Sequence, residues 1–428
     1  MLTPSPKGFG STDNMLHRLT EPFADGSAKR YFYRYLTGQA YGALLTLVSI
    51  MDNLRQLHII RGLAALYVAV GHAKVVFWSG GAEYLKKYPL ESWNILDFLL
   101  FAIDMLSSSA QEFVIVFFVL SGFFINYSFN KNNWKMKDFL INRIVRIYPP
   151  YLFSVLISIF VFKFIHFYNP TLFTLSSVKP IIIRMTNSYS ELDWTGLLKS
   201  LFYLPQKDYI AGNLSYWSLL PEWIFYLIIP FTINSKQWLF IIFVTAYFFD
   251  VFMPVNISSH DHILKFVFEY GFYFYLGVIS HDVIFNTEWK NKMPSKFISY
   301  CIAFILLFTT IILGVITERK IISFDKISYL FACLLSLFSM MTLLKYPVKG
   351  GSYKIGVYLG DISYSLYVFH LPIYYLFYSF LVKYYNTDIF YSRIYWLVVP
   401  FAILGAHMAY LLVEKHTLKY IKTLKLKR

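Results

Sequence analysis

The stretch RGLAALYVAVGH, residues 61–72, is apolar except for one ionisable residue at each end. It lies within residues 59–78, which is long enough to cross a bilayer as an α-helix, since a crossing takes about 20 apolar residues. Arg61 and His72 are separated by about three helical turns, so their side chains share one face about 16 Å apart along the axis. Ionisable groups inside a span cost about 3 kcal/mol at mid-bilayer, and we therefore treat both residues as functional candidates.

The composition extends this prediction to the whole chain. Of its 428 residues, 57% are hydrophobic, 21% aromatic and only 15% charged, which leaves too few polar groups to coat a soluble protein of this size. The net charge of +15 does not indicate nucleic acid, because the basic residues cluster in short loops between apolar stretches. The chain is therefore predicted to be an integral membrane protein that contacts lipid and no nucleic acid.

The same length criterion predicts an all-α fold, a polytopic membrane helix bundle of about ten transmembrane helices. The expected spans are residues 59–78, 110–129, 148–168, 216–234, 237–255, 263–280, 296–316, 325–344, 356–380 and 391–413. Lysine and arginine concentrate in the loops after even-numbered spans and in the C-terminal tail, which predicts that both termini are cytoplasmic.

Two regions fall outside this regular pattern. Residues 1–50 open with a polar stretch rich in proline and glycine, and we expect an N-terminal extension that is either an interfacial helix over 31–50 or a mis-assigned start. Residues 51–428 then form one membrane domain. In the long third connection, residues 194–204 predict a helix at the outer interface that could cover a substrate entrance, with a plain structured loop as the alternative.

The absence of several signals also narrows the prediction. Cys301 and Cys333 lie in apolar stretches without metal-ligand spacing, so neither a disulfide framework nor a metal site is expected. The N-terminus shows no cleavable signal peptide.

Two positions suggest acid–base chemistry and anion binding. His72 lies well inside the bilayer, where a neutral imidazole can take a proton near neutral pH, although a lone buried histidine is more often a packed, hydrogen-bonded residue. Arg143 and Arg146, in RIVRIYPPY, lie about one turn apart at the cytoplasmic mouth of the third span. Paired guanidinium groups at this spacing suit phosphate or pyrophosphate, and a topogenic anchor is the simpler alternative.

The remaining polar residues lie in later spans. Glu222, in YWSLLPEWIFY, needs a partner inside the membrane, for which a histidine is the natural choice. The stretch GDISYSLYVFHLP places Ser363, Tyr364, Tyr367 and His370 in the ninth span, where serines and tyrosines often bond neighbouring helices. The sequence leaves the roles of two further buried carboxylates open, those of Glu112 and Glu269.

Taken in order, these stretches together with FFVLSGFFI in the second span resemble the acyltransferase-3 family of bacterial membrane O-acyltransferases, from about residue 51 to about residue 415. The resemblance implies a ten-helix enzyme of the bacterial inner membrane. Such an enzyme takes an acyl group, usually acetyl, from cytoplasmic acyl-coenzyme A and delivers it to a hydroxyl of a carbohydrate acceptor. Typical acceptors are O-antigen, capsule, exopolysaccharide and other lipid-linked glycans.

The resemblance also implies roles for residues. His72 matches the family's essential histidine, Arg61 its partner in the Arg-x10-His motif, and Arg143 and Arg146 the motif on the donor side. Glu222 and His370 match an acidic residue and a histidine of two further motifs. We expect His72 to act as general base or to carry a transient acyl group, with Glu222 or Glu112 orienting it, and we expect substrate contacts from Ser363, Tyr364, Tyr367 and Trp217.

A polytopic transporter or flippase is the alternative from another class. Such proteins also carry buried charges, but they usually show inverted repeats and pairs of helices broken by glycine or proline, which this sequence lacks. A sensor or scaffold without chemistry would have little reason to tolerate the insertion cost of these groups.

Overall fold

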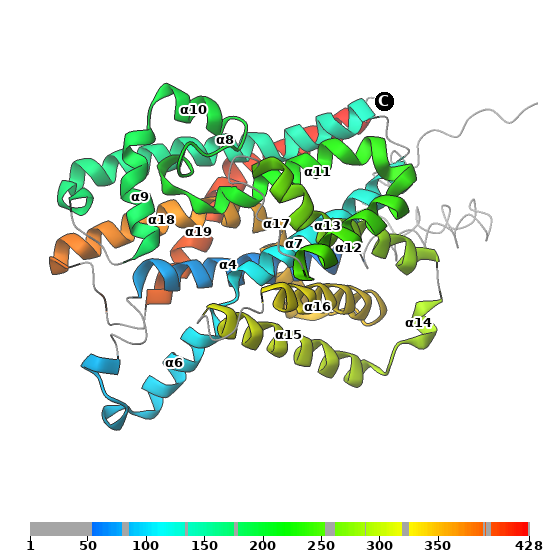
Figure 1. The fold of residues 1–428 in the computed structure, drawn as a ribbon, viewed down its shortest axis with the longest axis horizontal. Helices are drawn as coiled ribbons and strands as arrows, with labels where there is room; N and C mark the ends of the chain where they lie inside the picture. Colours follow the sequence, from blue (N-terminus) through cyan, green and yellow to red (C-terminus); the bar gives the residue numbers. More distant parts are fainter. Residues whose placement is uncertain are drawn as a thin grey trace, which may run out of the picture.

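The computed structural model describes residues 54–78, 85–132, 136–174, 179–252, 262–286, 288–318, 325–387, 390 and 395–426. Across those residues the chain contains helices and turns and no strand, which confirms the all-α prediction. The long helices lie side by side in one elongated bundle (Figure 1).

Ten helices make up most of this bundle: α4 (Leu57–Phe77), α7 (Ala110–Asn132), α8 (Met136–Tyr168), α11 (Leu219–Thr232), α12 (Lys236–Phe252), α13 (His262–Asn286), α15 (Lys296–Glu318), α16 (Asp325–Lys345), α18 (Ser363–Tyr385) and α19 (Val399–Ala409). Shorter α-helices connect them or extend their ends: α6 (Ile95–Leu106), α9 (Pro180–Asn187), α10 (Trp194–Ser200), α14 (Trp289–Lys292), α17 (Gly350–Asp361) and α20 (Lys415–Leu426).

The remaining elements are single helical turns. The 3-10 turns are η1 (Leu90–Ser92), η2 (Pro170–Phe173), η3 (Ser188–Glu191), η4 (Ile210–Gly212), η5 (Leu214–Ser218), η6 (Ile233–Ser235) and η7 (Tyr395–Val398). A π-helical turn, η8 (Tyr410–Glu414), joins α19 to α20. Such a turn holds one more residue than an α-helical turn.

Every one of the ten predicted spans overlaps one or more of these helices. Seven helical segments among the described residues are long and apolar enough to cross a membrane: Leu57–Phe77, Ala110–Phe129, Met136–Tyr168, Leu214–Phe249, Lys296–Glu318, Asp325–Lys345 and Ser363–Tyr385. The predicted spans 216–234 and 237–255 both fall in Leu214–Phe249, as α11 and α12 joined by η6. The number ten therefore stays a prediction.

The two ends of the bundle carry different elements. The C-terminus and α14 with its lysines lie at one end, whereas α6 lies at the other (Figure 1). This agrees with a basic face on one side of the membrane, and the cytoplasmic position of the C-terminus stays a prediction. The extension 1–50 lies outside the described residues.

The helix predicted at 194–204 is present as α10, but it lies along the side of the bundle beside α8 (Figure 1). The hydroxyl groups of Tyr148 and Tyr151 donate to the carbonyl oxygens of Leu201 and Ser200, at 3.0 and 2.6 Å. Tyr151 is 17 residues, or about 25 Å, before the end of α8, so α10 lies well away from that helix end.

The tightest helix contact joins α7 and α13. A Cβ atom at Gly122 would lie 2.0 Å from the carbonyl oxygen of Phe274, and one at Gly277 would lie 1.9 Å from that of Val119. Small residues let helix backbones approach closely in a membrane, where packing replaces the hydrophobic effect as the driving force. This contact holds the helix carrying FFVLSGFFI in the centre of the bundle.

We expect Gly277→Leu to separate α7 from α13 and to destabilise the protein by about 3 kcal/mol, because the new side chain meets backbone that cannot move aside. Thermal unfolding in detergent measures the loss. Gly351→Ala is the matched control, since a Cβ atom at Gly351 meets nothing within 4 Å. Equal melting temperatures for the two variants would contradict the close-packing argument.

Candidate functional site

A cavity of about 270 Å³ opens among the helices and brings together most of the polar residues singled out in the sequence. Its lining includes the predicted residues Arg61, Arg143, Arg146, Glu222, Ser363, Tyr364 and Tyr367. They come from α4, α8, α11 and α18, which are far apart in sequence. The residues that line this cavity do not include His72, His370 or Trp217.

Close packing between α4 and α17 sets one wall of the pocket. A Cβ atom at Gly62 would lie 2.5 Å from the backbone nitrogen of Gly360, and one at Gly360 would lie 2.2 Å from the carbonyl oxygen of His58. The two glycines therefore bring Arg61 next to the start of α18, where Ser363 and Tyr364 follow.

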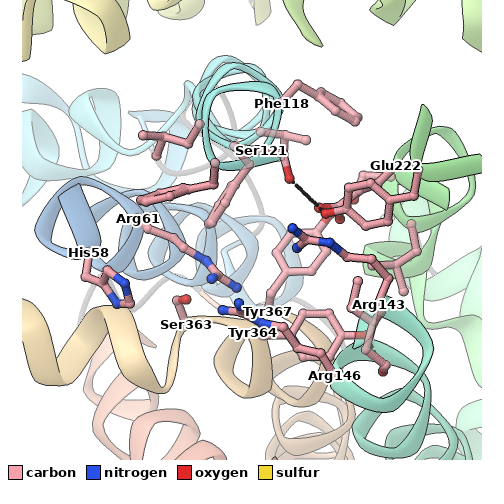
Figure 2. Close-up of a pocket in the computed structure, with 18 of the residues that line it drawn as sticks. His58, Arg61, Phe118, Ser121, Arg143, Arg146, Glu222, Ser363, Tyr364 and Tyr367 are labelled. Carbon is pink, nitrogen blue, oxygen red and sulfur yellow. Dashed lines mark hydrogen bonds between the residues drawn. The ribbon is translucent and has the colours of Figure 1, made fainter. Parts of the chain in front are cut away.

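Three guanidinium groups point into this cavity. Arg61, Arg143 and Arg146 converge on its centre (Figure 2). In the part of the chain that the structure describes, none of them forms an ion pair with a carboxylate within 4.0 Å. Arginine side chains inside a membrane protein normally have an anionic partner, so three guanidinium groups without a carboxylate partner around one cavity are suited to bind an anion.

Arg143 shows this most clearly. Its guanidinium carbon lies 5.2 Å from the ring centroid of Phe139 and 5.1 Å from that of Tyr226, in cation–π contact with both. Its Nε atom is buried and has no hydrogen-bond partner. Aromatic rings therefore hold the side chain in place while donor capacity stays available to a ligand.

The carboxylates of the same cavity are occupied by hydroxyl groups. Ser121 donates to Oε1 of Glu222 at 2.6 Å, and Tyr226 donates to the same oxygen (Figure 2). Ser365 donates to Oε2 of Glu414 at 2.6 Å. One oxygen of each carboxylate thus accepts from hydroxyl groups, and neither carboxylate lies within 4.0 Å of an arginine nitrogen in the described part of the chain.

The predicted partnership between Glu222 and a histidine is therefore wrong. Hydroxyl groups of Ser121 and Tyr226 solvate this carboxylate, and Glu112 is likewise bound by Ser328, at 2.8 Å. Among the described residues, neither carboxylate is hydrogen-bonded to His72, whose partner is another histidine.

His72 and His370 form a direct hydrogen bond. The Nδ1 atom of His72 lies 2.7 Å from Nε2 of His370, and the two rings are nearly parallel, with their centroids 5.0 Å apart. The His370 side chain is fully buried, and its Nδ1 atom lies 2.8 Å from the carbonyl oxygen of Leu366.

The Leu366 carbonyl fixes the proton positions along this chain. A carbonyl oxygen can only accept, so Nδ1 of neutral His370 must carry hydrogen and its Nε2 must be an acceptor. Nδ1 of His72 then donates to that acceptor, and Nε2 of His72 keeps its lone pair. The pair therefore presents one defined basic nitrogen, in the way that a second residue fixes the tautomer of a catalytic histidine.

A proline places His370. Pro372 has no N–H group, so the carbonyl of Val368 lacks its usual helical donor. Ser154 and Asn213 donate to that oxygen instead, at 2.7 and 3.0 Å. These bonds tie α8 and the turn before α11 to the segment of α18 that carries His370.

Tyr367 links the cavity to the histidine pair. It lines the cavity, and its ring centroid lies 6.2 Å from that of His370 and 6.0 Å from that of Phe117. Its hydroxyl group is 2.7 Å from that of Ser218. Trp217 instead packs its ring 5.3 Å from Tyr270 and does not reach the cavity lining.

Seven polar lining residues were not singled out as site residues from the sequence: His58, Ser121, Tyr127, Ser128, Ser218, Tyr226 and Glu414. Ser121 lies in FFVLSGFFI. Tyr226 is four residues, or one helical turn, after Glu222, so the helical spacing could have predicted that both side chains share one face. Glu414 is buried in the π-helical turn, which no sequence pattern indicated.

The comparison with protein families gives this site a context. The model of the acyltransferase-3 family, described as an acyltransferase domain, matches residues 54–412. The chain belongs to the acyltransferase-3 family. Searches of curated proteins and of solved structures found no significant match. This acyltransferase-3 protein is thus a membrane acyltransferase, and its cavity and histidine pair are its candidate active site.

The proline network of this acyltransferase gives a testable energetic coupling. Ser154→Ala removes one of the two donors to the Val368 carbonyl and should cost about 1–2 kcal/mol of stability. In a Pro372→Ala background the restored N–H group can take over that carbonyl, so the same change should cost less. Thermal unfolding of the four proteins of this cycle measures the difference.

Ser190→Ala is the matched control, because Ser190 only bonds a carbonyl of its own turn at the surface. Additive effects of Ser154→Ala and Pro372→Ala would show that the serine does not compensate for the proline.

Proposed function

We propose that this acyltransferase moves an acetyl group from cytoplasmic acetyl-coenzyme A to a hydroxyl of a cell-surface or lipid-linked carbohydrate in the bacterial inner membrane. The observation that carries the proposal is the set of three guanidinium groups without carboxylate partners that line one cavity beside a histidine pair. A donor with several phosphate groups and a long arm suits this arrangement.

The donor fits the charges of the cavity. Coenzyme A carries a pyrophosphate and a ribose phosphate, and planar guanidinium groups bind phosphate oxygens through two parallel hydrogen bonds. Arg61, Arg143 and Arg146 would hold these phosphates. The carboxylates of Glu222 and Glu414 form no ion pair within 4.0 Å with these guanidinium groups among the described residues, and both accept hydrogen bonds from hydroxyl groups.

The donor also fits the length of the site. Arg61 and His72 lie on the same helix, about 16 Å apart along its axis. The pantetheine arm of coenzyme A is an extended chain that can bridge such a separation, with its phosphates at Arg61 and its thioester at His72. Tyr367 and Phe117 would lie beside its path.

The chemistry follows from the proton positions of the histidine pair. The Nε2 atom of His72 takes the proton of the acceptor hydroxyl as the oxygen attacks the thioester carbonyl. A new C–O bond forms and the C–S bond breaks, and the proton passes from His72 to the departing thiolate. His370 holds the imidazole throughout, because His72 Nδ1–H keeps its bond to His370 Nε2.

The acceptor would approach from the other end of the bundle. His72 is five residues, or about 8 Å, from the last residue of α4, whereas Arg61 lies toward the opposite end of that helix. A donor held at the arginines and an acceptor arriving from the far side would therefore meet at His72. The acyltransferase-3 family supports the transfer reaction.

The central test uses radiolabelled acetyl-coenzyme A and membranes containing the native chain or a variant. His72→Ala should reduce label transfer to envelope glycan by at least about 100-fold, because it removes the general base. His370→Gln should retain more activity than His370→Leu, since a glutamine oxygen can still accept from His72 Nδ1–H.

Detergent gel filtration must show that each variant is folded. Near-native transfer by His72→Ala would remove His72 from the mechanism, and equal activity of the two His370 variants would remove the relay.

The donor subsite is tested by Arg143→Lys and Arg146→Lys. Lysine keeps the charge but loses the planar pair of donors, so we expect KM for acetyl-coenzyme A to rise about tenfold in each variant. Arg184→Lys is the matched control, since Arg184 is exposed on α9 and does not line the cavity. An unchanged KM in both site variants would reduce these arginines to topological anchors.

A further inference from the structure

The surface of α6 is unusual for a connecting helix. Its apolar side chains point outward around most of its circumference, with exposed fractions of 81% for Ile95 and 58% for Leu99. The large exposed side chains are those of Ile95, Leu96, Phe98, Leu99, Ile103 and Leu106. Helix α6 slants away from the bundle, so these residues face the surroundings of the protein (Figure 1).

The C-terminal end of α6 lies deeper in the membrane than Phe77, the last residue of the membrane-spanning helix α4. Tyr67 of α4 donates to the carbonyl oxygen of Leu106, and a Cβ atom at Gly71 would lie 2.8 Å from that of Ser107. Gly71 is six residues before Phe77, so this contact lies about 9 Å inside the end of α4. Because the hydrocarbon core is about 30 Å thick, α6 runs from one membrane surface into the adjoining leaflet, with its C-terminal end deepest.

The polar side chains of α6 form hydrogen bonds within the protein. Asn94 and Asp97 form a capping box in which each side chain accepts from the other residue's backbone N–H group, at 3.0 and 3.1 Å. Asp104 is fully buried, and its carboxylate accepts a hydrogen bond from Tyr395. Asp97 is thus engaged in the cap and Asp104 points into the protein, so neither carboxylate lies on the exposed apolar surface of α6.

The N-terminal end of α6 carries the residues expected at a membrane surface. Trp93 precedes the helix and donates through Nε1 to the carbonyl oxygen of Tyr88, at 3.0 Å. Glu91 and Lys87 are exposed beside them. Aromatic rings with polar tips gather at the level of lipid head groups, with charged residues beyond them.

We propose that α6 is a half-membrane helix whose exposed apolar side chains bind the acyl chains of phospholipids in the leaflet opposite the arginine-lined pocket. With 12 residues it is about 18 Å long, close to the thickness of one hydrocarbon leaflet. Lipid is the surrounding medium at the depth of its C-terminal end. The inference is independent of the proposed donor and acceptor.

A phospholipid probe with a photoreactive diazirine on its acyl chain tests the proposal on the unmodified protein in phospholipid nanodiscs. After illumination, peptide mass spectrometry locates the adducts. We expect adducts on residues 95–103 at a yield comparable with that on α15, whose exposed Phe304 and Ile305 serve as the lipid-facing reference. Adducts on α15 without adducts on α6 would overturn the proposal.

A second measurement identifies any other occupant. Hydroxyl-radical footprinting in the same nanodiscs should leave Phe98 unoxidised while Tyr420 of the exposed tail is oxidised. Oxidation of Phe98 to the level of Tyr420 would place α6 in water. Amine crosslinks between Lys86 or Lys87 of two chains, with no lipid adducts on α6, would assign the surface to a second copy. Either result would refute lipid binding.

Discussion

Hydrocarbon offers no hydrogen bonds, so each polar group that this protein carries at membrane depth must be satisfied within the chain or by a ligand. The carboxylates obey this constraint through serine and tyrosine hydroxyl groups. The carbonyl of Val368, deprived of its helical donor by Pro372, obeys it through Ser154 and Asn213. The three guanidinium groups of the pocket have no carboxylate within 4.0 Å among the described residues, which makes the pocket the candidate place for an anionic ligand.

The same constraint separates the chemistry of the site into two parts. Three arginines share a cavity with Glu222 and Glu414. Among the described residues they form no ion pair with either carboxylate, and hydroxyl groups donate to both acids. The histidine pair lies beyond Tyr367, away from these charges, and takes its orientation from a backbone carbonyl. The guanidinium groups and the histidine pair therefore lie at different depths of the bundle, although α4 contributes to both through Arg61 and His72.

The sequence predicted the helical class, ten apolar stretches that each overlap a helix, and seven of the cavity-lining residues, because hydrophobic length and intramembrane charge are local properties of a chain. It did not predict the hydrogen bond between His72 and His370. The two residues are 298 positions apart, and the pattern around each one indicates only a buried histidine. The partner expected for His72 was a carboxylate. Small hydroxyl groups, which carry no charge pattern, proved to solvate those acids instead.

Helix α6 was not predicted from the sequence, because its 12 residues are too few for a transmembrane span and too apolar for a typical loop. The location of α10 beside α8, well away from the end of that helix, depends on the two tyrosine–carbonyl bonds and could not follow from its composition.

The π-helical turn at Tyr410–Glu414 has a consequence for the whole C-terminal end of the chain. One residue more than an α-helical turn rotates everything that follows by about 100° around the helix axis. Deleting a single residue there would restore an ordinary helix and turn the basic face of α20 to another side of the bundle. The extra residue thus sets two directions at once: the side of the bundle that the basic face of α20 covers, and the direction in which the buried carboxylate of Glu414 points.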